Sequence, residues 1–280
     1  MRDHPLTVYT PESPLRQPTK FVRDMIADLL ASRELAWRLF VRDLSAQHRT
    51  SVLGYFWVFV PPLVASLPFV YLNSTGVVRM GDTPIPYAAY AIVGTIIWQT
   101  FVDALNSPLR TVNAARSMLT RINFPREAIL LSGLMQVAFA FLVRLVLLIA
   151  VFAAFALQPA ATAPLFFVGM LSVVGTGFMI GLILTPFGIL YSDVPNSLPI
   201  ATTFLMLLTP VLWYPPPGSG LAALNPLTPL ITTTRDWLTT GSAAHLGGFI
   251  LVSVVTVTFL VLGWVAYRLA LPHLIARLGN

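Results

Sequence analysis

Long apolar segments separated by short polar stretches make up most of the chain from residue 55 onwards. A bilayer core about 30 Å thick needs about 20 apolar residues in a helix that crosses it. Six segments are close to that length or exceed it: Tyr55–Leu72, Ala88–Leu105, Ile129–Leu157, Leu165–Leu190, Leu198–Trp213 and Gly247–Leu271. The pattern therefore predicts an all-α integral membrane protein with six transmembrane helices per protomer.

The polar stretch before the first apolar segment has the 3.6-residue period of an amphipathic helix. Ser32 is a suitable N-cap residue for this helix. The apolar face consists of Trp37, Phe40, Val41 and Leu44, and the polar face of Glu34, Arg38, Arg42, Ser45 and Arg49. Basic amphipathic helices beside a span lie in the plane of the lipid headgroups. We therefore expect residues 32–50 to form an interfacial helix, with packing on a soluble partner as the alternative.

Prolines mark two segments outside the predicted spans. Four of them occur in the first 20 residues, so residues 1–31 are expected to form a cytoplasmic tail with a short helix over Phe21–Ala31. Between spans 5 and 6, a stretch rich in proline and glycine begins at Pro215. Because proline is tolerated in a first helical turn, Pro229–Leu238 is expected to be one of two re-entrant short helices. Residues 51–280 then form one six-span transmembrane domain.

Composition and charge support this topology. The chain is 56% hydrophobic and 10% charged, whereas soluble domains contain about 25% charged residues. Of its 17 Lys and Arg residues, 14 lie in the N-terminal region, the loop Asn106–Ala128 and the C-terminal end. Only Arg79 and Arg235 lie in the opposite loops, and Arg144 lies inside the third span. The positive-inside rule therefore predicts that both termini are cytoplasmic. Because residues 1–20 contain no apolar core of a signal peptide, we expect the N-terminus to stay uncleaved.

The sequence contains no pattern for catalysis or metal binding. There is no cysteine, so disulfides and thiolate metal sites are excluded. The one lysine, Lys20, has no glycine before it, so the chain lacks a G-x-x-x-x-G-K-[ST] phosphate loop. Histidines and aspartates are scattered without metal-ligand spacing. We expect no catalytic residue, metal or cofactor in this chain, and any use of ATP needs a separate subunit.

The segment Arg42–Trp57, RDLSAQHRTSVLGYFW, resembles a signature of ABC permeases for polysaccharide export, R-D-L-x-x-R-Y-x-x-S-x-L-G-x-x-W. Further matches follow in the family's order: GTIIW at 94–98, NFPRE at 123–127, YSD at 191–193, TPV at 209–211, NPLTP at 225–229 and RD at 235–236. The similarity extends from about Arg33 to the C-terminus. Gln47, His48 and Ser192 depart from the family pattern.

The resemblance implies a function and its partners. The chain would be the transmembrane subunit of an ATP-driven exporter that moves undecaprenyl-linked polysaccharide, such as O-antigen, across the bacterial inner membrane. It would act as a homodimer with two ATP-binding cassette subunits, which would bind ATP and Mg²⁺. An ABC permease for a smaller lipophilic compound is the alternative. A membrane enzyme acting on lipid-linked sugars is a different class, but it should show acidic residues clustered at one membrane face.

The first cytoplasmic loop is the candidate site of coupling to the ATPase. Thr111–Arg121 is predicted to form a short amphipathic helix with Arg116 and Arg121 exposed, and the resemblance implies that this helix seats in a groove on the ATPase. The remaining candidate coupling residues are Phe124, Pro125, Arg126, Glu127 and Asp193. The alternative is a solvated loop whose arginines only fix the topology.

The candidate substrate channel contains a charge and several aromatic residues. Arg144, in the third span, would cost about 2.5–3.5 kcal/mol at the centre of a membrane helix. It is expected either to contact the pyrophosphate of a lipid-linked sugar or to pair with a carboxylate such as Asp103. The aromatic residues that could line a sugar path are Tyr55, Phe59, Tyr71, Trp98 and Phe101, with an aromatic belt as the alternative. Glycines at 175, 177 and 181 predict close helix packing, within the chain rather than at a dimer interface.

Overall fold

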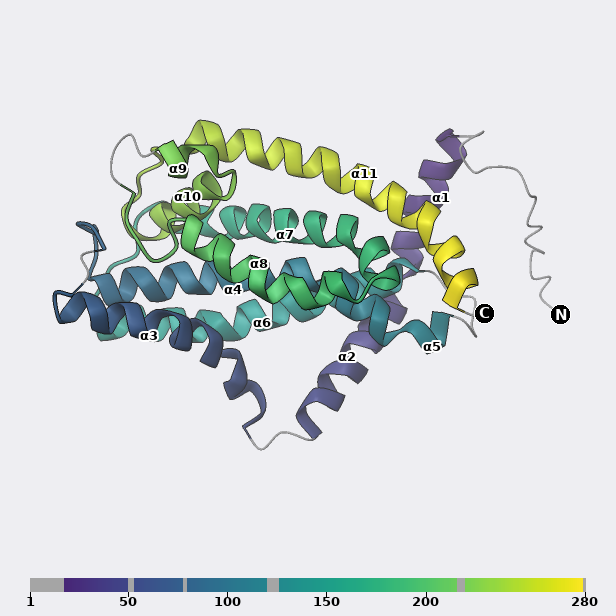
Figure 1. Ribbon diagram of the computed structural model, residues 1–280, viewed down its shortest axis with the longest axis horizontal. Coiled ribbons are helices and arrows are strands. Elements are labelled where there is room, and N and C mark those ends of the chain that lie inside the picture. The colour runs from purple at the N-terminus through teal and green to yellow at the C-terminus, as the bar shows by residue number, and fades with distance from the viewer. Residues whose placement is uncertain (1–17, 50–52, 78–79, 120–125, 216–219, 279–280) are drawn as a thin grey trace.

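The computed structural model describes residues 18–49, 53–77, 80–119, 126–215 and 220–278, and the regular structure of these residues is entirely helical (Figure 1). In chain order the helices are α1 (Pro18–Ala31), α2 (Arg33–Arg49), the 3-10 helix η2 (Gly54–Val58), α3 (Val60–Ser74), α4 (Tyr87–Ala114), α5 (Arg116–Leu119), α6 (Glu127–Ala154), α7 (Leu165–Leu190), α8 (Asp193–Leu208), α9 (Gly220–Leu224), α10 (Leu227–Thr239) and α11 (Leu246–Leu278).

Among the residues that the structure describes, four helices, α4, α6, α7 and α11, are long and apolar enough to cross a membrane. They run along the long axis of the molecule, and α4 and α7 pack together at its centre (Figure 1). The prediction of an all-α membrane protein with several spans is therefore confirmed. α3 and α8 have 15 and 16 residues, which gives about 22–24 Å at 1.5 Å per residue, less than the bilayer core.

Two of the predicted spans are interrupted in the structure. The first, Tyr55–Leu72, divides at Phe59 between η2 and α3. The fifth, Leu198–Trp213, ends as a helix at Leu208, because Thr209 has an extended backbone and proline at position 210 has no N–H to continue the helical bonds. Hydropathy detects neither break, since the residues on both sides are apolar.

The bundle has two different ends (Figure 1). α9 and α10 lie at one end, beside the beginning of α4 and the end of α8, and we call it the α10 end. α5 lies at the other end, with the last turns of α11, and we call it the α5 end. α1 and α2 cross the bundle near the α5 end instead of running along it. Each end thus joins segments that are distant in sequence.

Ser32 joins α1 to α2. Its hydroxyl donates a hydrogen bond to the carbonyl oxygen of Asp28 at 2.6 Å, and its own carbonyl oxygen accepts from the N–H of Ala36. Ser32 therefore continues the helical bonding between the two helices, and the prediction that its side chain caps α2 is wrong. The chain before residue 18 lies outside the described residues.

α2 packs on α6 with one face and leaves another face open. Ala36, Leu39 and Phe40 are buried. The open face carries Trp37, Arg38, Val41 and Arg42, all of them exposed. The predicted apolar face is therefore divided, since Phe40 lies inside the protein while Trp37 and Val41 are left for lipid or a partner. Placement of α2 in the headgroup plane stays a prediction.

Glycines allow α7 to pack closely against α4. A Cβ atom at Gly177 would lie 2.5 Å from the carbonyl oxygen of Phe101, and one at Gly181 would lie 2.1 Å from that of Leu105. The prediction of close packing within the chain is confirmed at these two positions. α7 also contacts α11, where the hydroxyls of Thr176 and Thr256 are 2.9 Å apart. α4 and α7 therefore form the core against which the other helices pack.

Substitution of Gly181 by alanine should destabilise the protein by about 1–3 kcal/mol, because the added methyl group would overlap backbone that cannot easily move. The melting temperature of the detergent-purified protein measures this effect. Gly175→Ala is the matched control in the same helix, since a Cβ atom there meets Thr256 at an ordinary 3.6 Å. Equal melting temperatures for the two variants would contradict the packing of α7 on α4.

Candidate functional site

A buried ion pair connects α4 and α6 in the middle of the bundle. The Arg144 side chain is 4% exposed, and its Nη2 atom lies 2.7 Å from Oδ2 of Asp103. Nη1 of Arg144 donates to the hydroxyl of Thr100 at 3.4 Å. Since Arg144 is 17 residues, or about 25 Å, from the start of α6, the pair is far from both ends of the helix. One of the two interpretations of Arg144 drawn from the sequence, pairing with Asp103, thus matches the structure.

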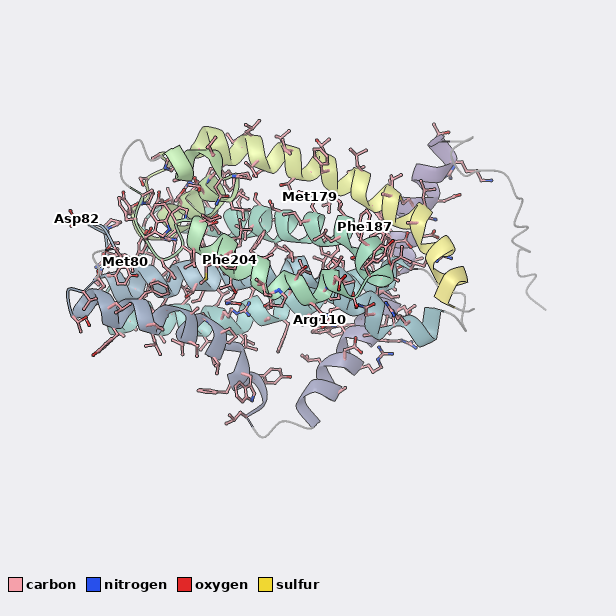
Figure 2. The ribbon with its side chains drawn as sticks, in the orientation of Figure 1. Met80, Asp82, Arg110, Met179, Phe187 and Phe204 are labelled. Carbon is pink, nitrogen blue, oxygen red and sulfur yellow. The ribbon has the colours of Figure 1, made fainter. Side chains whose placement is uncertain are left out.

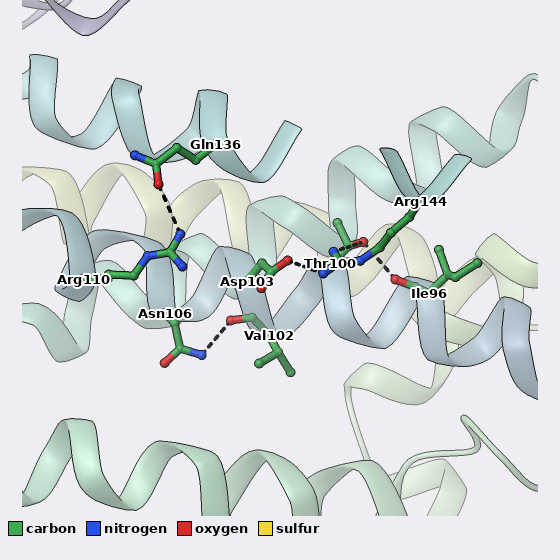
Figure 3. A network of polar contacts seen from close by, with 8 residues as sticks. All are labelled: Ile96, Thr100, Val102, Asp103, Asn106, Arg110, Gln136 and Arg144. Atoms are coloured by element: carbon green, nitrogen blue, oxygen red, sulfur yellow. Dashed lines mark hydrogen bonds and ion pairs between the residues drawn. The ribbon is translucent and has the colours of Figure 1, made fainter. Parts of the chain in front are cut away.

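Asp103 belongs to a line of polar side chains on α4. Gln99, Asp103, Asn106 and Arg110 follow one another at intervals of four, three and four residues, which places them on one helical face, and we call them the polar stripe. The Asp103 side chain is 29% exposed, Arg110 is exposed, and Gln99 and Asn106 are partly exposed. Figure 3 shows Arg110 and Arg144 on opposite sides of Asp103 along α4. Polar groups on a membrane helix need protein or water beside them rather than lipid.

α3 covers this side of α4 only towards the α10 end. There the hydroxyl of Thr95 donates to the carbonyl oxygen of Pro62 at 3.1 Å, and both residues are buried. Towards the α5 end, η2 and the beginning of α3 bend away from α4 (Figure 1), and η2 contacts α6 and α2 instead. Figure 2 shows Arg110 in the half of α4 nearer the α5 end. The polar stripe is therefore left partly uncovered within one protomer.

Gln136 of α6 connects the polar stripe to α2. Its Oε1 atom accepts from Nη2 of Arg110 at 3.4 Å, and its Nε2 atom donates to Oδ2 of Asp43 at 3.4 Å. Asp43 also pairs with Arg42 at 2.7 Å. We call Arg110, Gln136, Asp43 and Arg42 the arginine relay. It contains two guanidinium groups and one carboxylate, so its net charge is positive.

Aromatic side chains lie beside the relay. Phe139 of α6 contacts both Tyr55 of η2, at 5.2 Å between ring centroids, and Phe40 of α2, at 6.1 Å. Phe40 in turn lies 5.4 Å from Trp37. These contacts hold η2 and α2 on the same side of α6. Phe59, partly buried after η2, contacts Phe56 at 6.1 Å.

Trp98 and Phe101 lie in the core of the protomer. Their rings are 5.1 Å apart, and the residues are 2% and 1% exposed. Neither side chain lines a path in this conformation, because both point into the packed core between helices. The aromatic pattern in the sequence does not reveal this, since buried and channel-lining aromatic residues share the same spacing.

At the α5 end, α4 is longer than the predicted second span. It continues to Ala114, so the prediction that a separate helix begins at Thr111 is wrong. Thr111 is buried and donates to the carbonyl oxygen of Ser107 at 2.9 Å. The residues from Asn106 onwards form helix in spite of their polarity, because their buried positions pack on neighbouring helices.

Arg116 joins the two segments that were predicted to be cytoplasmic. It begins α5, and its Nη2 atom donates to the carbonyl oxygen of Ile189, at the end of α7, at 2.9 Å. The residue is only partly exposed, so the prediction of an exposed Arg116 is wrong. This bond fixes α5 beside the turn that leads to Asp193, which is exposed in the first turn of α8.

Glu127, at the start of α6, is buried in an ionic cluster. Its Oε1 atom lies 3.0 Å from Nη1 of Arg268 in α11, and Arg268 also pairs with Asp28 of α1. Arg126 precedes the helix and is partly exposed. The cluster therefore links the beginning of α6 to both the first and the last helix. Among the predicted coupling residues, Arg121, Phe124 and Pro125 lie outside the described residues.

At the α10 end, Arg235 is buried in α10, a helix that the sequence placed outside the spans. Its Nη2 atom donates to the carbonyl oxygens of Pro210 and Val211 at 2.8 and 3.0 Å, and its guanidinium carbon lies 3.8 Å from the centroid of the Tyr90 ring. Arg235 thus satisfies the carbonyl groups left free where α8 ends. A Cβ atom at Gly94 would lie 2.3 Å from the Val211 oxygen, which explains the glycine of the GTIIW segment.

Sequence reasoning missed the residues that build the polar surface, including Arg110, Gln136 and Arg268. A signal for the stripe was present, because polar residues at four, three and four spacing inside an apolar segment mark one helical face. The partners on α2 and α6 had no such signal. Within the described part of the chain, no group of three or more His, Cys, Asp or Glu residues could hold a metal ion.

Removal of Asp103 should destabilise the protein by about 3–5 kcal/mol, because the buried guanidinium group of Arg144 is then left unpaired. Removal of Arg144 should cost less, because the Asp103 side chain is 29% exposed. We expect Asp103→Leu and Arg144→Leu each to lower the melting temperature in detergent. The double variant should melt closer to the wild type than either single variant, since it removes both charges together. A double variant that loses the sum of the two single effects would contradict the pairing.

The three relatives found by comparison with known proteins are all O-antigen export system permease proteins. No family model matches the chain. An O-antigen export system permease protein RfbA of Klebsiella pneumoniae is 25% identical over 229 residues, which cover 76% of this chain and 86% of the relative. The protein of the same name from Myxococcus xanthus is 26% identical over 216 residues, covering 75% and 82%. The resemblance found in the sequence is thereby confirmed, and this membrane protein is a distant homologue of the O-antigen export system permeases.

Proposed function

We propose that the chain is the transmembrane subunit of an ATP-driven exporter that moves undecaprenyl-linked, O-antigen-like polysaccharide across the bacterial inner membrane. The observation that carries this proposal is the homology to O-antigen export system permeases over about three quarters of the chain. Four membrane-crossing helices and a partly uncovered polar stripe are what such a subunit needs. The absence of a phosphate loop from the sequence fits a permease without ATPase activity of its own.

The proposed topology has six crossings, with the α5 end in the cytoplasm. η2 and α3 together run from Gly54 to Ser74 and would form the first crossing, with a break at Phe59. α8 would form the fifth crossing together with the irregular residues 209–213 that follow it. The excess of Lys and Arg in the segments around the α5 end supports this orientation. In this arrangement α9 and α10 are the re-entrant helices, and burial of α10 among α4, α7 and α11 gives its backbone the protein cover it needs.

The ATP-binding cassette partner would dock at the α5 end. Arg116 connects α5 to the end of α7, and the Glu127–Arg268–Asp28 cluster connects α6 to α11 and α1. A force applied to α5 would therefore reach α7 through a direct polar bond, and the ionic cluster would join α6, α11 and α1 at the same end. We assign coupling to this end as a whole, with Arg116, Arg126 and Asp193 as its described residues.

The sugar chain would pass along the polar stripe. In lipid, the partly exposed Asp103, Asn106 and Arg110 would be costly, so a second copy of the chain or a water-filled path has to cover them. A homodimer in which the two polar stripes line one shared path would cover these side chains with protein and would also give them water. Carboxylate and amide groups bond sugar hydroxyls, while Tyr55 and Phe59, near the open edge, offer flat apolar faces.

Deletion of the gene should abolish surface polysaccharide, with lipid-linked polymer retained inside the cell, and a plasmid copy should restore it. Immunoblots of the cell surface and of inner-membrane lipid extracts measure both pools. A plasmid copy with Arg116→Glu should restore little export and should co-purify less ATPase. The glutamate carboxylate cannot donate to the carbonyl oxygen of Ile189 and would be repelled by it. Normal surface polysaccharide in the deletion strain would disprove the proposed function.

The control variant is Asp82→Lys, which also changes the charge by two units but lies exposed at the α10 end. It should restore export like the wild-type gene and should co-purify the same amount of ATPase. If Arg116→Glu and Asp82→Lys behave alike in both measurements, the assignment of coupling to the α5 end is wrong.

A further inference from the structure

Arg110 is an arginine on a membrane helix that has no carboxylate partner among the described residues. Its Nη2 atom donates to the amide oxygen of Gln136 at 3.4 Å, and the ion pairs of the described residues do not include Arg110. Arg144, by contrast, is neutralised by Asp103 at 2.7 Å. A charge that is exposed beside lipid and not paired within the chain needs an anion or water from elsewhere.

Arg110 also lies near the end of α4, where the headgroup layer is expected if α4 crosses the membrane. It precedes the last residue of α4, Ala114, by four positions, or about 6 Å along the axis. α2, which leaves Trp37 and two arginines exposed, packs beside it through the relay. A long arginine side chain at such a position extends its charge into the headgroup layer. The phosphate of a membrane-embedded lipid is therefore within reach, but its acyl or prenyl chain stays in the core.

The relay holds Arg110 in position and adds a second cation. Gln136 accepts from Arg110 (Figure 3) and donates to Asp43, so its amide cannot turn without losing one of the two bonds. Arg42 is held by the same carboxylate at 2.7 Å and is exposed. The relay thus joins two guanidinium groups through one amide and one carboxylate, which leaves a surplus of positive charge. Guanidinium groups match phosphate oxygens in a planar, bidentate geometry.

We propose that Arg110, assisted by Arg42, binds the diphosphate that joins the prenyl carrier to the sugar chain. This inference rests on the proposed function and names the residues that recognise its substrate. With the diphosphate at Arg110, the sugar extends along α4 towards Asn106 and Asp103, and the prenyl chain leaves through the side that α3 and η2 do not cover. Phosphatidylglycerol carries one phosphate, and so offers two guanidinium groups half as many anionic oxygens as the diphosphate does.

The test measures binding of undecaprenyl diphosphate to the purified full-length protein in phosphatidylcholine nanodiscs, by native mass spectrometry over a titration. Arg110→Gln should weaken binding at least about tenfold, Arg42→Gln should weaken it less, and Arg110→Lys should fall between Arg110→Gln and the wild type. Arg23→Gln is the control, because Arg23 is an exposed arginine of α1 outside the relay. It should bind like the wild type, and all variants should elute as the wild type does in gel filtration.

Two results would overturn the proposal. One is unchanged binding of undecaprenyl diphosphate by Arg110→Gln. The other is equally tight, equally Arg110-dependent binding of phosphatidylglycerol, which would make this a general site for anionic lipid. Either result leaves the export assignment standing if the wild-type gene still restores surface polysaccharide. Loss of that restoration, in contrast, would remove the proposed function whatever the binding measurements give.

Discussion

A charged or polar side chain inside a bilayer has to be paired, hydrogen-bonded or hydrated, and α4 is where this protein meets that constraint. One side of α4 packs so closely on α7 that Gly177 and Gly181 have no room for a methyl group. The other side carries the polar stripe, where the ion pair between Asp103 and Arg144 neutralises the deepest charge. The same helix therefore serves as the centre of the core and as a polar surface.

The two ends of the bundle use buried arginines in different ways. At the α10 end, Arg235 caps the carbonyl groups left free by the break after α8, and so stabilises an irregular backbone where α10 packs. At the α5 end, Arg116 and Arg268 connect helices that are distant in sequence. In the proposed exporter, with the α5 end in the cytoplasm, the first arrangement would suit a fixed outer end and the second an inner end that responds to an ATPase.

The sequence predicted features that depend on local patterns. The bounds of α7 match the fourth predicted span, and α10 contains the predicted short helix Pro229–Leu238, because apolar runs and proline positions determine both. The burial of Thr111, the bond from Arg116 to Ile189 and the relay at Gln136 depend on which helices become neighbours. Spacing along one helix carries no information about its neighbours, so these features emerged only from the packed structure.

The central claim is that the polar stripe faces water rather than lipid in the membrane. Since the chain contains no cysteine, single cysteines can be introduced without removing others. Labelling of Asn106→Cys in intact inverted membrane vesicles with a membrane-impermeant maleimide tests the claim directly, with Ile149→Cys on an exposed apolar part of α6 as the reference. The account predicts fast labelling at position 106 and little at position 149. Absence of labelling at position 106, under conditions that label a cysteine at Arg23, would contradict it.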